Sequence, residues 1–360
     1  MTFVNSGLLR VARQSLGLSQ GEAASKINIP QVTLSRYENA VAIPSPEVLV
    51  RAAQIYDVPV SFFEQTDVVL GAPLSVHPMW RKKQSVTVKE MDKIIAEINI
   101  RIMQIRRMLA GVEFVPEMTI PKFDIEEYGE DVEHIAALVR SHWMIPKGPI
   151  LDLTAIAERA GAMVIYSSMG DSSVSGVTIP VPGLLPVIFL NFDQPADRAR
   201  FTLAHELAHL VMHRFPNPSM EKQANAFASA FLMPARDIQS AFIGKRIDLS
   251  RLAALKPEWK VSMQALLYRA QSLGLVPERQ ASYLWRQFSF HRMKIHEPIE
   301  LNFALEEPGV LSRMLKLHLE TFGYSIPDFA KMLHWHAHRL KQLYNLKDSY
   351  QTQGVGLKLA

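Results

Sequence analysis

Apolar residues in the N-terminal part of the chain recur at spacings of three and four, and turn residues interrupt them at short intervals. This pattern predicts a bundle of about five short helices. Ser19 followed by Glu22 forms a capping box, which marks the start of the second helix. Two short helices joined by a tight turn within such a bundle are typical of a helix-turn-helix DNA reader. The expected helices cover residues 8–17, 19–26, 31–39, 47–56 and 60–64.

A long amphipathic helix is expected over residues 89–111, after a linker at 66–88 that contains glycine, prolines and a basic cluster. Its apolar positions form a heptad seam. The seam could pair with the same helix of a second copy, or it could pack on the next domain, and the pattern favours neither. The seam consists of Met91, Ile95, Ile98, Ile102, Ile105 and Leu109.

Strand patterns replace helix patterns between residues 162 and 190. Runs of β-branched and apolar residues predict strands at 162–166, 174–181 and 185–190, after helices at 133–143 and 153–160. We expect a small antiparallel sheet that leads directly into a helix. An edge strand of such a sheet can pair with an extended peptide, and 174–177 or 185–189 are the candidates for that edge.

The helix that follows the sheet carries the sequence H-E-x-x-H as His205, Glu206 and His209. Positions four apart lie on one face of a helix, so both imidazoles can reach a single metal ion. Zinc held by neutral nitrogen ligands lowers the pKa of a bound water, and an adjacent carboxylate such as Glu206 can accept its proton. The motif therefore indicates metal-assisted hydrolysis, usually of a peptide bond.

A third ligand is expected from the next helix, which begins near Ser219 and carries Glu221 in its first turn. Two histidines and one glutamate form a zinc set that leaves a position open for water. The rival is His213, which lies about 12 Å along the helix axis from His205. One ion cannot easily reach both, so we expect His213 to support the site rather than to ligate. Tyr166 and Tyr268 are guesses for an oxyanion donor.

Composition limits the kinds of site and the cellular compartment expected for this chain. Among the 360 residues there is no cysteine, which excludes disulfides and cysteine zinc sites and favours a reducing compartment. No stretch approaches the apolar length of a membrane span, and no signal segment is evident. We therefore expect a cytoplasmic protein without membrane contact. The net charge of +4 permits nucleic-acid binding without arguing for it.

The N-terminal residues resemble the Cro/lambda-repressor type (XRE family) of helix-turn-helix over about residues 6–64. The likeness is carried by 18–20, 23–24 and 32–39. It implies that helix 31–39 lies in the major groove of operator DNA, with Leu34 and Tyr37 in the core. Basic and acidic side chains balance in this segment, so its non-specific DNA affinity should be weak. The resemblance implies base or nearby phosphate contacts from Gln31, Val32, Ser35 and Arg36, and phosphate contacts from Gln20 and Asn39.

A second resemblance covers roughly residues 130–290. The blocks 200–209, 221–228, 232–234 and 259–266 occur in the order found in the ImmA/IrrE family of metallo-endopeptidases. The resemblance implies that His205, His209 and Glu221 bind zinc in a gluzincin-like site and that Glu206 is the general base. Members of this family commonly carry an XRE helix-turn-helix and resemble enzymes that cleave a partner repressor.

The expected fold class is α+β and mainly helical. We expect a five-helix helix-turn-helix domain at 1–66, a linker and long helix at 67–111, a zincin-like peptidase domain at 112–293 and a C-terminal helical domain at 294–360.

These features predict a DNA-binding transcription regulator, expected to be a homodimer, whose zinc endopeptidase domain cleaves a protein partner such as a repressor. The alternative is a repressor, or the antitoxin of a toxin–antitoxin pair, in which the metal site is structural or inactive. Its protein partner would then be a toxin-like protein. A plain interaction scaffold is the third reading.

Overall fold

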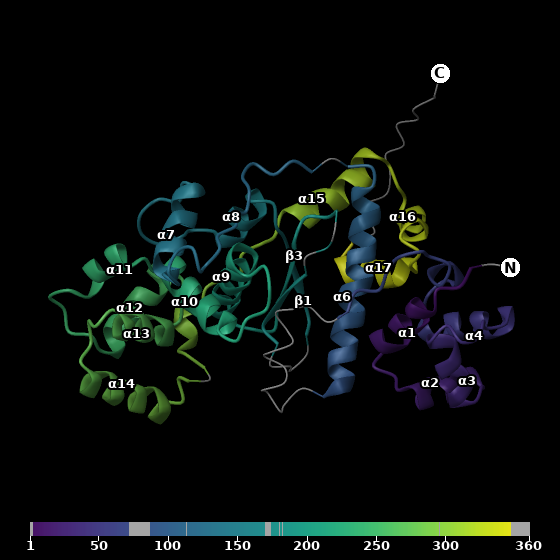
Figure 1. Ribbon diagram of the computed structural model, residues 1–360, viewed down its shortest axis with the longest axis horizontal. Coiled ribbons are helices and arrows are strands. Elements are labelled where there is room, and N and C mark those ends of the chain that lie inside the picture. Colours follow the sequence, from purple (N-terminus) through teal and green to yellow (C-terminus); the bar gives the residue numbers. More distant parts are fainter. Residues whose placement is uncertain are drawn as a thin grey trace, which may run out of the picture. The chain divides into compact units, whose positions relative to one another are not determined.

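The computed structural model describes residues 3–71, 87–112, 114–169, 174–179, 181, 183–294 and 296–346. The chain is mainly helical with one small three-stranded sheet, which confirms the expected fold class. The described residues fall into two compact units (Figure 1). Unit 1 lies within Met1–Pro73, Lys82–Phe114 and Leu311–Ala360, and unit 2 lies within Val115–Val310.

The five helices predicted at the N-terminus are all present in unit 1. Side-chain caps mark the start of the first two: Asn5 accepts hydrogen bonds from the amides of residues 7 and 8, and the predicted Ser19–Glu22 capping box is formed. Unit 1 consists of α1 (Ser6–Ser15), α2 (Gln20–Ile27), α3 (Gln31–Glu38), α4 (Pro46–Tyr56), η1 (Val60–Phe62), α6 (Val88–Leu109), α15 (Val310–Lys316), η3 (Leu317–Thr321), α16 (Ile326–Met332) and α17 (Ala337–Tyr344).

A buried ion pair fixes α3 against α1. The Arg13 guanidinium donates to both carboxylate oxygens of Glu38, at 2.6 and 2.9 Å, and both side chains are almost fully buried. The Gln20 amide donates to the same carboxylate at 2.9 Å. These contacts orient α3 from inside the bundle, a role that the sequence pattern did not reveal.

The heptad seam of α6 packs inside unit 1. Ile98, Ile102 and Ile105 are buried, and α6 packs against α1. The side chain of Asn99 pairs with the backbone of Leu70, accepting from its N–H at 2.7 Å and donating to its carbonyl at 3.1 Å. The contacts described for the seam lie within one chain. Pairing of the seam with a second copy stays a prediction. Most of the predicted linker, residues 72–86, lies outside the described residues.

The helices near the C-terminus belong to the same compact unit as the helix-turn-helix. The Trp335 and Phe62 rings lie 5.6 Å apart, and Arg339 donates to the last carbonyls of α4. His338 Nε2 lies 2.9 Å from Asp57 Oδ2. Residues 311–346 thus pack with sequence far upstream, whereas residues up to 310 pack in unit 2. The predicted domain boundaries at 66, 111 and 293 stay predictions.

Unit 2 contains the sheet and the helices on either side of it. Its first helices are capped by Asp131 and Asp152, and its central helix begins directly after Pro195. The elements are α7 (Val132–His142), α8 (Leu153–Arg159), β1 (Met163–Ser167), β2 (Gly176–Ile179), β3 (Val187–Asn191), α9 (Ala196–Met212), α10 (Met220–Leu232), α11 (Ala235–Phe242), α12 (Leu249–Trp259), α13 (Met263–Ser272), α14 (Glu278–Phe290) and η2 (Ile299–Leu301).

The sheet is mixed, which corrects the expectation of an antiparallel one. The strand order is β1-β3-β2, with β1 parallel and β2 antiparallel to β3. After β1 the chain reverses but does not place β2 directly beside β1. It leaves a gap one strand wide, and β3 occupies this gap between β1 and β2. The candidate edge at 185–189 is therefore wrong, because β3 is central and buried throughout. Strand β2 is an edge strand among the described residues, as proposed for 174–177.

Glycine at position 176 allows α9 to lie close to the sheet edge. A side chain built there would meet the Thr202 methyl at 2.5 Å and the carbonyl oxygen of Phe189 at 3.1 Å. Helix α9 packs on both β2 and β3 and is buried along nearly all of its length. The site described next is therefore held between a buried helix and an edge strand. No helix among the described residues combines the length and apolar character needed to cross a bilayer.

Candidate metal centre

Helix α9 presents the H-E-x-x-H side chains in a buried position. His205, Glu206 and His209 are 7%, 4% and 7% exposed. The helical spacing of four places the two imidazoles on one face, with their Nε2 atoms 3.1 Å apart. The predicted convergence of the two histidines is therefore present.

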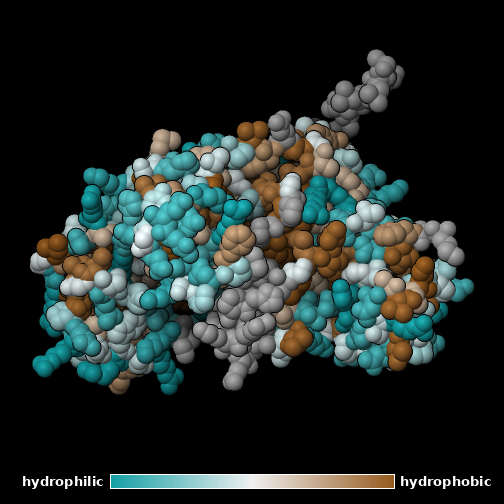
Figure 2. All heavy atoms as spheres, in the orientation of Figure 1, coloured by the Kyte–Doolittle hydropathy of each residue, from teal (hydrophilic) through white to brown (hydrophobic). Residues whose placement is uncertain are grey.

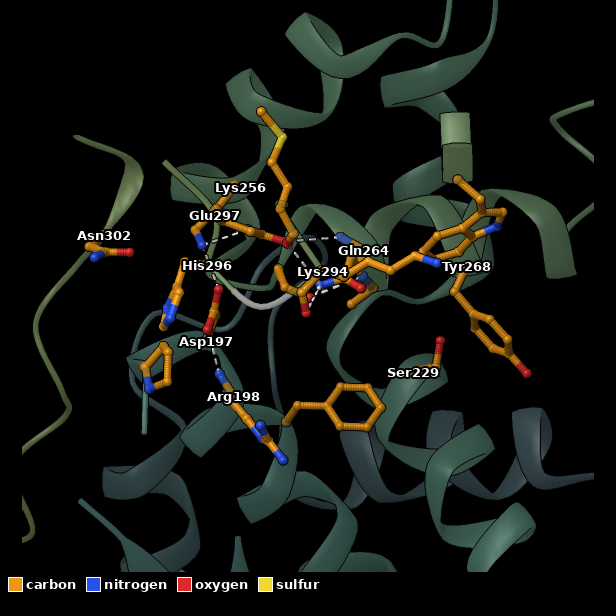
Figure 3. Close-up of a pocket in the computed structure, with 16 residues that line it drawn as sticks. Asp197, Arg198, Ser229, Lys256, Gln264, Tyr268, Lys294, His296, Glu297 and Asn302 are labelled. Carbon is orange, nitrogen blue, oxygen red and sulfur yellow. Dashed lines mark hydrogen bonds and ion pairs between the residues drawn. The ribbon is translucent and has the colours of Figure 1, made fainter. Parts of the chain in front are cut away.

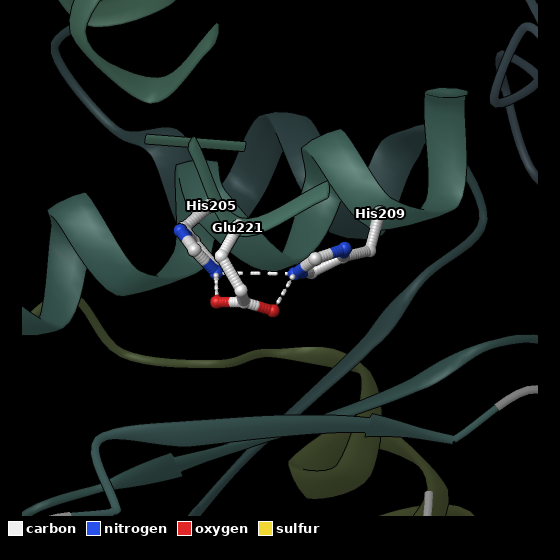
Figure 4. Close-up of side chains that lie close together, drawn as sticks. All are labelled: His205, His209 and Glu221. Atoms are coloured by element: carbon white, nitrogen blue, oxygen red, sulfur yellow. Dashed lines mark hydrogen bonds and ion pairs between the residues drawn. The ribbon is translucent and has the colours of Figure 1, made fainter. Parts of the chain in front are cut away.

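Glu221, from the first turn of α10, lies across from both imidazoles (Figure 4). Its Oε2 is 3.4 Å from His205 Nε2, and its Oε1 is 3.5 Å from His209 Nε2. The ligand atoms of these three residues all lie within 4.8 Å of one another. The structure thus brings together the three residues predicted to bind the metal.

Outer hydrogen bonds set the tautomers of both histidines. His205 Nδ1 lies 3.1 Å from the amide oxygen of Asn225, which can only accept, so Nδ1 carries the proton. His213 Nε2 donates to the amide oxygen of Gln223 at 3.1 Å, which leaves His213 Nδ1 as the acceptor for His209 Nδ1, 2.9 Å away. When both rings are neutral, their Nε2 atoms therefore direct lone pairs toward Glu221, as metal ligation requires.

The electrostatics of the site also suit a cation. Burial lowers the pKa of His209 to about 2, so this imidazole is neutral and able to ligate. Burial works in the same direction on His205, but the hydrogen bond to Glu221 and the two neighbouring carboxylates raise its pKa overall. A divalent cation would replace the proton that these carboxylates attract. Burial raises the pKa of Glu206, and the nearby Thr178 of β2 acts against this shift.

Two carboxylate oxygens at the site have no hydrogen-bond partner among the described residues. They are Oε1 of Glu221 and Oε2 of Glu206, and both are buried. Buried carboxylate oxygens are normally paired or bound to a metal. The unpaired oxygens, the facing Nε2 atoms and the nitrogen and oxygen donor set fit a zinc ion.

The remaining sequence candidates lie elsewhere. The ring of His213 contacts His209 from the side opposite to Glu221, as expected for a supporting residue. Tyr268 is 61% exposed, and the structure gives neither it nor Tyr166 a contact with the three clustered residues. Asn225 and Gln223 were missed, although Asn225 follows Glu221 by one helical turn and so had to share its face.

The predicted DNA-reading helix α3 exposes most of its candidate residues. Gln31, Val32 and Arg36 are exposed, Ser35 is half-buried, and Leu34 is buried as expected. Tyr37 was expected in the core but is only half-buried. Val32 on α3 and Val41 and Ile43 before α4 are exposed apolar side chains, and hydrophobic patches are visible on the face of the molecule shown in Figure 2.

The two residues expected on phosphates make contacts within unit 1. The Asn39 amide donates to the Ser35 carbonyl at 2.8 Å, and the Gln20 amide is directed to Glu38. Asn39 is exposed and Gln20 is half-buried.

Two family models match the chain. The model described as IrrE N-terminal-like domain matches residues 157–271, a range that contains His205, His209 and Glu221. The model described as Helix-turn-helix matches residues 9–63. No curated protein matches the chain. Both resemblances predicted from the sequence are confirmed by these matches.

Proposed function

We propose that this chain, a DNA-binding regulator that joins an XRE-type helix-turn-helix domain to an IrrE/ImmA-like domain, is a zinc-dependent endopeptidase acting on a protein partner. The observation that carries the proposal is the convergence of His205 Nε2, His209 Nε2 and the Glu221 carboxylate beside the buried carboxylate of Glu206. The partner would be a repressor, and cutting it would change transcription.

In this proposal His205, His209 and Glu221 hold the ion, and Asn225 and His213 orient the two imidazoles. When bound, zinc supplies a Lewis acid that makes water a nucleophile near neutral pH. Glu206 accepts the proton of the attacking water and passes it to the leaving amine. Burial raises the pKa of this carboxylate, which strengthens it as a proton acceptor.

The substrate would lie along the edge strand β2. Among the described residues this strand pairs only with β3; it also packs against α9 and carries Thr178 close to Glu206. An extended peptide could hydrogen-bond to the free edge, which would place a peptide bond beside the metal cluster.

A direct test combines metal analysis with a search for cleavage products. The full chain, purified and loaded with zinc, should hold one zinc ion. Incubated with a protein extract of its host, it should generate new N-termini that labelling and mass spectrometry can identify. A chain that binds zinc but yields no new N-termini would favour the alternative of a repressor or antitoxin with a structural metal site.

For DNA recognition we propose that α3 enters the major groove and that the chain acts as a homodimer in the cytoplasm. Gln31, Val32, Ser35 and Arg36 would contact bases or nearby phosphates, and Gln20 and Asn39 would contact phosphates. The exposure of Gln31, Val32 and Arg36 supports this assignment.

Replacing Arg36 by alanine should weaken operator binding by about 1–3 kcal/mol, because an exposed guanidinium on the reading helix would lose its contact with a base. Fluorescence anisotropy at fixed salt, with an operator obtained by in vitro selection, measures the change. Arg10→Ala removes an equally exposed arginine from α1 and is the matched control. Equal affinity of the Arg36→Ala variant and the wild type would remove α3 from the groove.

Removing the imidazole that supports His209 should weaken zinc binding. A His213→Phe variant keeps the ring volume but lacks the acceptor for His209 Nδ1–H, and loss of such a partner typically costs about 10–100-fold in metal affinity. Competition with a chromophoric chelator measures it. His213→Gln, whose amide oxygen can accept the same hydrogen bond, should lose less, and the exposed His291→Ala should lose nothing. An unchanged zinc affinity in His213→Phe would contradict the supporting role.

A further inference from the structure

Unit 2 contains a cavity of about 470 Å³ whose lining includes none of the three clustered metal-site residues (Figure 3). Residues of α9, α10, α12, α13, α14 and the segment 293–302 line it. Its volume lies in the range that accommodates small organic ligands.

The lining of the cavity includes aromatic and apolar side chains. They are Phe201, Tyr268, Trp285 and Met293, of which Tyr268 is 61% exposed. Aromatic side chains pack favourably on the flat face of another ring. These side chains therefore favour a planar aromatic ligand over a flexible polar one.

The charges that face the cavity leave an excess of positive charge. Asp197 and Glu297 share the buried Lys256 as their ion-pair partner, whose Nζ lies 2.5 and 2.7 Å from their carboxylates. Arg198 and Lys294 also line the cavity, and no carboxylate in the described part of the chain forms an ion pair with either. Three cations thus face two carboxylates, and the two unpaired cations are available to an anion.

A buried hydroxyl in the lining points to a missing polar partner. Ser229 is 4% exposed, and its Oγ has no hydrogen-bond partner among the described residues. Figure 3 shows this hydroxyl directed from α10 into the cavity. A hydroxyl in such a place is normally satisfied, and an oxygen of a bound ligand would satisfy it.

We propose that this cavity binds a small aromatic organic anion, a carboxylate or a sulfonate. The anionic group lies between Arg198 and Lys294, the ring packs on the aromatic side chains of the lining, and Ser229 donates a hydrogen bond to the ligand. The site is built on the two helices that also carry the metal cluster: Phe201 is one turn before His205 on α9, and Ser229 is one turn after Asn225 on α10. Binding there requires neither zinc nor proteolysis, so it stands independently of the proposed function.

The test compares two fluorescent dyes that share one body. The probes are 8-anilino-1-naphthalenesulfonate and N-phenyl-1-naphthylamine, which lacks the sulfonate, and each is titrated into the full chain with and without zinc. We expect the sulfonate dye to bind saturably at one site per chain and at least about tenfold more tightly than the neutral dye. Equal affinities for the two dyes, or sulfonate binding that does not saturate at one site, would overturn the proposal.

Substitutions in the lining test whether the dyes bind in this cavity. The double variant Arg198→Glu with Lys294→Glu should weaken the sulfonate dye by at least about tenfold and leave the neutral dye unchanged. The matched pair Arg236→Glu with Arg279→Glu reverses two exposed charges of unit 2 outside the lining and should change neither. Ala265→Phe should fill the cavity and weaken both dyes. If that variant fails to fold, the charge pair still decides: full sulfonate affinity in Arg198→Glu with Lys294→Glu would overturn the assignment.

Discussion

A Glu206→Gln variant of the full chain should bind zinc like the wild type and lose cleavage of its protein substrate by about 10²–10⁴-fold or more. The amide has the shape of the carboxylate but cannot accept a proton from water. The zinc stoichiometry should not change, because His205, His209 and Glu221 keep their positions. Counting the new N-termini produced by each protein, alongside zinc analysis of both, measures the two effects separately.

The matched control for this variant is Glu258→Gln, an exposed glutamate on α12 that should keep full cleavage. If Glu206→Gln cleaves as fast as the wild type, Glu206 is not the proton acceptor. If neither the variant nor the wild type cleaves, and both regulate transcription equally, the metal site is structural. The alternative of a repressor or antitoxin would then replace the peptidase.

Replacing Lys256 by methionine should destabilise unit 2 by about 3–5 kcal/mol. The side chain is 1% exposed, and its ammonium is the shared partner of the buried carboxylates of Asp197 and Glu297. Methionine keeps most of the volume but leaves two buried negative charges without a cation. Hydrogen exchange read by mass spectrometry can measure the change in unit 2 alone, and Lys245→Met, at an exposed site, is the control.

The pH dependence of the stability lost in Lys256→Met follows from the direction in which the pKa of Lys256 is shifted. In the wild type, burial opposes the charge of Lys256, but its hydrogen bonds and ion pairs with the two carboxylates raise its pKa above 10.5. Its contribution is therefore fully present at neutral pH and is lost only as pH rises through that raised pKa. Lys256→Met lacks this contribution at every pH, so its deficit relative to the wild type should shrink as pH rises through the raised pKa of Lys256. A deficit that is constant with pH would mean that lost packing, not unpaired charge, is its cause.

Local signals in the sequence predicted the N-terminal helices and the convergence of His205, His209 and Glu221. The capping box at Ser19 and the spacing of His205 and His209 each depend on residues within a turn or two of one another. Glu221 could be proposed because it stands in the first turn of the next helix. Such short-range features can be predicted because packing with other elements rarely changes the local structure that they favour.

Features that depend on distant residues were not predictable in the same way. The strand that occupies the centre of the sheet determines the partner of β1. The alternation of apolar residues along each strand does not specify which strand is central. The Arg13–Glu38 pair joins residues 25 positions apart, and the contact between Arg339 and α4 spans more than 280 positions. In the sequence alone, charged residues of this kind resemble surface residues, because their burial depends on the folded structure.

Unit 1 is discontinuous in sequence, and this has a consequence for how the protein is made. The ribosome delivers residues 3–71 and α6 first, then the whole of unit 2, and only afterwards Trp335 and Arg339, which close over Phe62 and the end of α4. Because synthesis proceeds from the N-terminus, the part that reads DNA must wait for its last contacts until the part with the metal cluster has been completed. A nascent chain halted near residue 310 would therefore hold a finished unit 2 beside an unfinished DNA reader.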